Sequence, residues 1–199
     1  MELQVALPGN RLFRLFPDEQ PTDPREWDNL GTMACFHKRY CLGDSNLPFA
    51  SSEFDSWAEM EGYIWKELDA AVVLPLFLYD HSGITMNTTG FSCPWDSGRV
   101  GFIYVTKDKV KNEYGVKRLT KDILARVNKA LLNEVETYDQ YLTGDVYGYE
   151  IVKLNKCDQG HTHEEHEDSC SGFFGYDIKE NGILDHVSTE DAKVILGEV

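Results

Sequence analysis

The chain has 199 residues, with 34 acidic and 19 basic side chains and a formal charge of −15 at pH 7. Because 42% of the residues are hydrophobic and 12% are aromatic, we expect a folded chain with an apolar core, organised as a single domain over residues 1–199. The negative charge excludes a broad phosphate-binding surface, so we expect no direct binding of nucleic acid. No run of about 18 apolar residues predicts a membrane-spanning helix, and the start of the sequence lacks the basic-then-apolar order of a signal peptide.

Pairs of strands are separated by one or two helices in the predicted order of elements, β–β–α–β–β–α–α–β–β–α. We expect strands at about 11–16, 33–40, 70–80 and 99–105, a helix that starts at Ser51 or Ser52, helices at 107–114 and 121–142, and a short final helix capped by Ser188. Two further strands, 145–157 and 168–179, flank a hydrophilic loop. The order predicts an α+β fold, in which a mixed or largely antiparallel sheet packs against a few helices and a C-terminal hairpin protrudes.

Charge is unevenly distributed along the chain. Residues 40–98 carry nine acids against one base and residues 131–199 carry sixteen against four, whereas residues 106–130 carry eight bases against three acids. One interpretation is a solvated acidic surface with one basic helix. The other is an acidic face that binds a basic protein by charge complementarity. Such a face consists of Glu53, Asp55, Glu59, Glu61, Glu134, Glu136 and Asp139, of which the last three form an exposed ridge of the 121–142 helix.

The five cysteines are an odd number, which in the absence of a signal peptide favours a reducing cytoplasm with free or metal-bound thiols. A cluster of metal-ligand residue types lies at the predicted hairpin tip, 155–170. If the hairpin brings its two cysteines together, two thiolates and two imidazoles can form a tetrahedral zinc site. The alternative is a flexible, solvated acidic loop. The candidate ligands are Cys157, His161, His163, His166 and Cys170.

A second cluster combines a thiol, an imidazole and a carboxylate. Asp80 ends the 70–80 strand and His81 follows it, whereas Cys93 and Asp96 precede the 99–105 strand. Pairing of these strands therefore places the four side chains in one neighbourhood. A cysteine nucleophile needs a nearby base and a group that orients the base. The alternative, favoured by the absence of any established nucleophile motif, is that Cys93 packs as a small hydrophobic residue and Asp96 fixes a turn.

A third group lies around the 33–40 strand. Cys35 and His37 are two residues apart and therefore share a face of a strand, with Asp28, Cys41 and Asp44 nearby in the sequence. A hydrogen-bonded core histidine explains this pattern more simply than a site does. The phosphate-loop, dinucleotide-binding and zinc-protease motifs are absent, so those reaction classes are not expected.

Several segments resemble an uncharacterised family of small proteins from bacteriophages and bacterial mobile elements. They are DNLGTMACFHKRYCLGD (28–44), VVLPLFLYDHSGITM (72–86), FSCPWDSGRVGFIYV (91–105), ETYDQYLTGDVYGYEI (136–151) and DSCSGFFGYD (168–177). The resemblance implies an accessory protein made in a bacterial cytoplasm, and it carries no catalytic residue with it. Many such proteins interfere with host defences, and some of those are strongly acidic.

These observations lead to two hypotheses of different class. The first is a phage or mobile-element accessory protein that binds and inhibits a nucleic-acid-binding host factor, a basic protein or nucleoprotein complex, through its acidic face. The second is a small hydrolase or nucleotide-processing enzyme that uses Cys93 and His81, or a bound metal. The basic 106–130 segment also allows acid-to-base association of the chain with itself.

Overall fold

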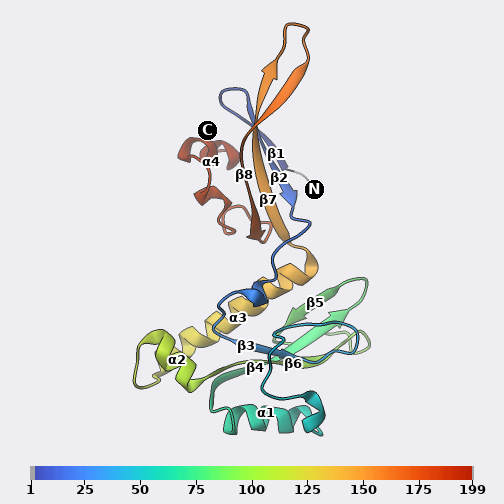
Figure 1. The fold of residues 1–199 in the computed structure, drawn as a ribbon, viewed down its shortest axis with the longest axis vertical. Coiled ribbons are helices and arrows are strands. Elements are labelled where there is room, and N and C mark those ends of the chain that lie inside the picture. The colour runs from blue at the N-terminus through green and yellow to red at the C-terminus, as the bar shows by residue number, and fades with distance from the viewer. Residues whose placement is uncertain (1–2, 199) are drawn as a thin grey trace. The chain divides into compact units, whose positions relative to one another are not determined.

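A computed structural model describes residues 3–198 of the chain (Figure 1). Contacts divide the chain into two compact units: unit 1, formed by Met1–Thr22 and Gly144–Val199, and unit 2, formed by Asp23–Thr143. The sequence predicts a single domain over residues 1–199 and gives no sign of this division. That the two units fold together as one domain stays a prediction.

Unit 2 contains a four-stranded antiparallel sheet in the order β3-β6-β4-β5. The strands are β3 (Thr32–Cys35), β4 (Ala70–Asp80), β5 (Ile84–Asn87) and β6 (Ser97–Thr106). The helices of this unit are α1 (Trp57–Lys66), α2 (Lys107–Tyr114) and α3 (Lys121–Thr143), with single 3-10 turns η1 (Pro24–Glu26) and η2 (Ser51–Glu53). Because β5 pairs with β4 only from Phe77 onward, Pro75 lies where one side of β4 is open and its missing N–H costs no bond to β5.

Helices cover both faces of this sheet (Figure 1). On one face, the α3 side chains Val127, Leu131 and Val135 pack with Met33 and Ile103. On the other, α1 contributes Met60 and Ile64, which pack with residues that include Phe102. A strand covered on both faces carries a continuous apolar run rather than an alternating pattern, which is the pattern of β6.

Unit 1 contains a second antiparallel sheet, in the order β1-β2-β7-β8. Its strands are β1 (Leu3–Leu7), β2 (Arg11–Pro17), β7 (Val146–Lys156) and β8 (Thr162–Phe174). The C-terminal segment, with η3 (Ile183–Asp185) and α4 (Thr189–Ile195), packs apolar side chains against Phe13, Tyr149 and Phe173. The strands β7 and β8 form the C-terminal hairpin.

The expected α+β fold with its C-terminal hairpin is confirmed, with two sheets in place of one. Three local expectations were wrong. The 33–40 strand ends at Cys35, the first full helical turn of α1 begins after the cap Ser56, and the hydrophilic loop expected between the hairpin strands is mostly strand β8. Within residues 3–198, no helix has the length and apolar character needed to cross a bilayer.

Candidate functional site

The β7–β8 hairpin extends past the end of β2 in unit 1 (Figure 1). The last β2 pair on β7 is Arg11 with Lys153, and β7 continues to pair with β8 up to Lys156. The chain reverses within a few residues, because the N–H of Cys157 donates to the carbonyl of His161 at 3.0 Å and the N–H of Gly160 donates to the carbonyl of Cys157 at 2.9 Å. Gly160 has a φ of +83°, the left-handed conformation that this tight reversal requires.

Strand β8 carries four carboxylates, on Glu164, Glu165, Glu167 and Asp168, and no lysine or arginine. All four residues are exposed. The N–H groups of the Arg14 guanidinium donate to Glu164 at 2.8 Å and to Glu150 at 3.0 Å, and this contact holds the pKa of Glu164 below its ordinary value. Arg14 is thus shared between two acids.

The second arginine of unit 1 has a different partner. Arg11 donates two hydrogen bonds to the buried carboxylate of Asp191, at 2.9 and 2.7 Å, and lies 3.9 Å from Glu167. By sequence, unit 1 has sixteen acidic and six basic residues, a formal charge of −10, although it holds fewer residues than unit 2. The acidic surplus of the chain is therefore concentrated in unit 1, and the exposed carboxylates of β8 are part of it.

The register of the hairpin separates the residues proposed as zinc ligands. Cys157 lies in the tip, whereas Cys170 pairs with Tyr149, eight residues back along β7 from Cys157. At about 3.3 Å per residue, eight residues of strand span about 26 Å. The expectation that the hairpin brings the two thiols together was wrong, because β8 begins at Thr162 and its strand separates Cys157 from Cys170.

The three histidines do not complete a site either. Asn155 pairs with His163, and Val152 pairs with His166. These two imidazoles therefore lie on opposite faces of β8, and both lie farther along the strand than the tip residue His161. His166 Nε2 lies 3.0 Å from the hydroxyl of Ser169. In the part of the chain that the structure describes, no group of three or more His, Cys, Asp or Glu side chains is placed to hold a metal ion.

Two of the acids assigned to the exposed ridge of α3 point inward instead. Glu134 accepts hydrogen bonds from the backbone N–H groups of Leu30 and Gly31, at 2.8 and 3.0 Å, and its side chain is only 14% exposed. Asp139 accepts from the hydroxyl of Thr85 at 2.7 Å and from the backbone N–H of Met86 at 2.6 Å. These two carboxylates hold unit 2 together, which corrects their assignment as partner-binding residues.

The remaining acids of that set stay at the surface of unit 2. Glu136 is exposed, and Glu61 lies 4.0 Å from the guanidinium of Arg99. Two of the others stabilise local turns, since Glu53 accepts from the backbone N–H of Ala50 and Glu59 accepts from that of Asp55. The exposed members are Glu53, Asp55, Glu59 and Glu136.

Sequence reasoning missed a buried charge cluster around Arg25. The Arg25 side chain is 4% exposed, and it donates to Asp44 at 2.8 Å, to Glu134 at 3.0 Å and to the carbonyl of Gly31 at 2.8 Å. The signal in the sequence was weak, because Arg25 lies in a proline-rich loop in which a basic residue is usually solvated. The cluster fixes this loop against α3.

The second candidate site does form in unit 2. β4 and β6 pair up to Tyr79 with Ser97, and the turn beyond them brings the Asp96 carboxylate within 3.4 Å of His81 Nδ1 and 3.6 Å of Cys93 Sγ. The predicted neighbourhood is therefore confirmed. The order of the groups differs from that of a nucleophilic triad, in which the imidazole lies between the thiol and the acid. Here the carboxylate lies between them: it accepts a hydrogen bond from the Cys93 thiol and lies in close contact with the His81 imidazole, so no base is oriented toward the thiol.

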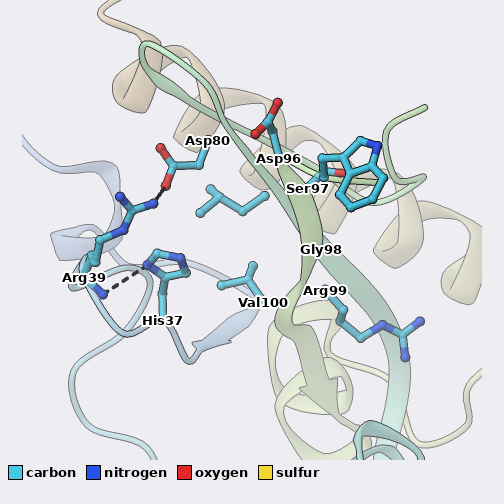
Figure 2. Close-up of a pocket in the computed structure, with 10 residues that line it drawn as sticks. His37, Arg39, Asp80, Asp96, Ser97, Gly98, Arg99 and Val100 are labelled. Carbon is cyan, nitrogen blue, oxygen red and sulfur yellow. Dashed lines mark hydrogen bonds and ion pairs between the residues drawn. The ribbon is translucent and has the colours of Figure 1, made fainter. Parts of the chain in front are cut away.

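A hollow of about 350 Å³ opens beside this turn (Figure 2). Its lining includes Trp95 and Asp96, but neither Cys93 nor His81. Figure 2 shows that the Arg39 and Asp80 side chains face one another as an ion pair, whereas Arg99 extends away from them. The Arg99 guanidinium lies 5.2 Å from the ring centre of Phe77, so it packs on an aromatic ring. The thiol and imidazole proposed for catalysis thus do not line the hollow next to them.

Four members of the third group line one hollow of about 750 Å³ in unit 2, whereas Asp28 does not line it. The four are Cys35, His37, Cys41 and Asp44. Burial raises the pKa of the Cys35 thiol to about 12, so this thiol stays protonated near neutral pH. The His37 ring stacks on Tyr40 with centres 5.0 Å apart. Asp44 binds Arg25 and accepts from the backbone N–H of Met33 at 3.0 Å. These contacts give Cys35 and Asp44 structural roles.

No family model, no curated protein and no solved structure matches the chain. The resemblance to a family of small proteins from bacteriophages and bacterial mobile elements stays a prediction.

Proposed function

We propose that the protein binds a basic, nucleic-acid-binding protein through the acidic hairpin, defined as β7 and β8 with their connecting turn. The observation that carries the proposal is strand β8, which in 13 residues presents four exposed carboxylates and no lysine or arginine. Carboxylates on a projecting hairpin are accessible to a partner from several directions, and their fields add over a Debye length of about 8 to 10 Å.

Electrostatics favours unit 1 over unit 2 as the binding part. With a formal charge of −10 in unit 1, the field around the hairpin attracts positively charged surfaces and repels phosphates. Exposed ion pairs are each worth only about 0 to 1 kcal/mol, so affinity has to come from several pairs acting together. Binding of this kind is fast and falls steeply as salt rises.

Competition with nucleic acid follows from the chemistry of the partner surface. Lysines and arginines that neutralise phosphates also pair with carboxylates. A protein that is bound to the hairpin through these side chains therefore cannot use them to bind nucleic acid. The resemblance to proteins of bacteriophages and mobile elements supports a bacterial host defence factor as the natural partner and the bacterial cytoplasm as the setting. Zinc has no part in this proposal.

The experiment compares two variants that remove the same number of charges from different places. The hairpin variant is Glu164→Gln, Glu165→Gln and Glu167→Gln, and the matched control is Glu53→Gln, Glu59→Gln and Glu136→Gln in unit 2. The readout is displacement of a fluorescent DNA duplex from lysine-rich linker histone at low salt, with circular dichroism to show that each variant is folded.

We expect the wild-type protein and the unit 2 control to displace the duplex, and the hairpin variant to lose at least about tenfold in potency, as several exposed ion pairs together would give. Equal loss in both variants would place the binding face outside the hairpin. Failure of the wild-type protein to displace the duplex would contradict the proposal outright.

A further inference from the structure

The backbone of β8 has an open edge. β8 is the last strand of its sheet, and within the described residues no strand pairs with its outer side. In an antiparallel ladder, successive residues direct their N–H and C=O groups alternately toward one neighbour and toward the other. The hydrogen bonds around the tip therefore fix which β8 residues face outward.

Two bonds set this alternation. Cys157 donates its N–H to the carbonyl of His161, so this pair faces inward across the hairpin. Leu154 donates its N–H to the carbonyl of Asn10 at 2.7 Å, which lies on the opposite side of β7 from β8. Because Leu154 pairs with Glu164, both residues direct their backbone groups away from one another. The same alternation directs the backbone groups of Thr162, Glu164 and His166 to the open edge, and those of His163 and Glu165 to β7.

The side chains on this edge select the kind of strand that can pair with it. A second copy of β8 would bring carboxylates against carboxylates, and like charges on facing strands are destabilising. The register shift between Ile151 and Val152 places a bulge near Glu167, which limits the regular part of the edge to Thr162–His166. Glu164 and Glu165 project to opposite faces of the sheet, so a partner strand can meet each of them with a basic residue on each face.

We propose that the partner adds an extended segment with two consecutive basic residues to the outer edge of β8, as a further strand of the sheet. This inference rests on the proposed function and specifies how the acidic hairpin takes its partner. Main-chain hydrogen bonds at Thr162, Glu164 and His166 supply the register. The exposed carboxylates of Glu165, which also accepts from Asn155, and of Glu164, which is shared with Arg14, supply the preference for Lys or Arg. The alternative is that the carboxylates only prevent aggregation through the open edge. In that case no strand binds to β8.

Amide hydrogen exchange measured by NMR on the full chain tests the inference. The probe is a synthetic peptide with two consecutive lysines between valine and threonine residues, and the control is the same peptide with alternate backbone nitrogens methylated. We expect the outward amides of Thr162 and Glu164 to exchange at least about tenfold more slowly with the probe than without it, because each gains a hydrogen bond. The inward amides of His163 and Glu165 serve as internal references.

Proline substitution gives a second test that leaves all four carboxylates in place. His166→Pro and Thr162→Pro each remove an outward N–H, whereas His166→Ala and Thr162→Ala keep it. We expect each proline variant to bind the peptide about tenfold more weakly than its alanine control. The proline removes one hydrogen bond to the added strand and disturbs the close fit of the two backbones. The exchange rates of His163 and Glu165 show whether the hairpin is still folded.

The two proposals fail in different ways. One outcome overturns only the strand addition. In it, the probe binds and the hairpin variant binds it more weakly, but the outward amides stay unprotected and the methylated peptide binds equally well. Acidic recognition then stands. If neither the peptide nor the basic protein binds, both proposals are overturned.

Discussion

The guanidinium of Arg25 lies 3.0 Å from the carboxylate of Glu134, although Arg25 belongs to the 3-10 turn η1 and Glu134 to the middle of α3. Asp44 completes the cluster at 2.8 Å. A buried guanidinium that lacks one of its carboxylates keeps most of its desolvation penalty, so the stability of unit 2 depends on Glu134.

We therefore predict that Glu134→Ala lowers the free energy of unfolding by about 3 to 5 kcal/mol, the range for breaking a buried ion pair. Glu136→Ala, two residues away on the exposed side, should change it by no more than about 0.5 kcal/mol. Urea unfolding followed by tryptophan fluorescence measures this directly, because all four tryptophans, Trp27, Trp57, Trp65 and Trp95, lie in unit 2. A cost for Glu134→Ala as small as that for Glu136→Ala would show that the cluster is not structural.

A second prediction concerns the contact of β6 with β3. A Cβ at Gly101 would lie 1.9 Å from the carbonyl oxygen of Ala34, which is far inside contact distance. Gly101→Ala should therefore separate the paired strands and cost about 3 kcal/mol or more. Gly98→Ala is the matched control on the same strand, because a Cβ there meets no atom within 4 Å. Similar unfolding midpoints in urea for the two variants would contradict the close approach.

Unit 2 should lose stability at alkaline pH. Burial raises the pKa of the Cys35 thiol from its ordinary 9.0 to about 12, and burial raises those of Tyr104 and Tyr138 from 10.0 to about 12. The folded state thus keeps protons that the unfolded state releases, so the stabilisation is complete below pH 9 and is lost as pH rises toward 12. In urea unfolding, Cys35→Ala should flatten this decline and Cys41→Ala should not. A stability that is constant from pH 9 to 12 would contradict the burial of these groups.

Replacing the thiol and the imidazole next to Asp96 should not affect partner binding. Cys93→Ser and His81→Ala leave the charge of β8 unchanged, so both variants should displace DNA from linker histone as the wild-type protein does. The same variants test the enzyme hypothesis. A catalytic thiol at Cys93 requires that the wild-type protein has a hydrolase or nucleotide-processing activity and that both variants lose it. Loss of displacement in either variant would move the binding face to the turn around Asp96.

Sequence periodicity predicted the elements that bury an apolar stripe. α3 is the clearest case, because Val127, Leu131 and Val135 recur at helical spacing and all three are buried. Strand β8 was predicted only from Asp168 onward, and its first part was expected to be a loop. Its first eight residues, Thr162–Ser169, include no apolar side chain, and backbone pairing with β7 makes them a strand.

The inward carboxylates of α3 show a second limit of sequence reasoning. Glu134 and Asp139 are each next to a buried position, Val135 or Tyr138, so they lie at the border of the apolar stripe. The side chain at a border position points either to solvent or to a neighbouring loop, depending on the tertiary structure. The periodicity of the sequence carries no information on which of the two occurs. The neighbourhood of His81, Cys93 and Asp96 was predictable, because two apolar strands that pair must bring their ends together.

Chemical-shift mapping tests the central claim most directly. Unlabelled linker histone is added at low salt to the isotope-labelled full chain, and the perturbed amides are identified. The account predicts that perturbations concentrate on residues 158–168 of the acidic hairpin, disappear when salt is raised, and leave the acidic positions of unit 2 at Glu53, Glu59 and Glu136 unchanged. Perturbations that centre on those unit 2 positions, or none at any salt concentration, would contradict it.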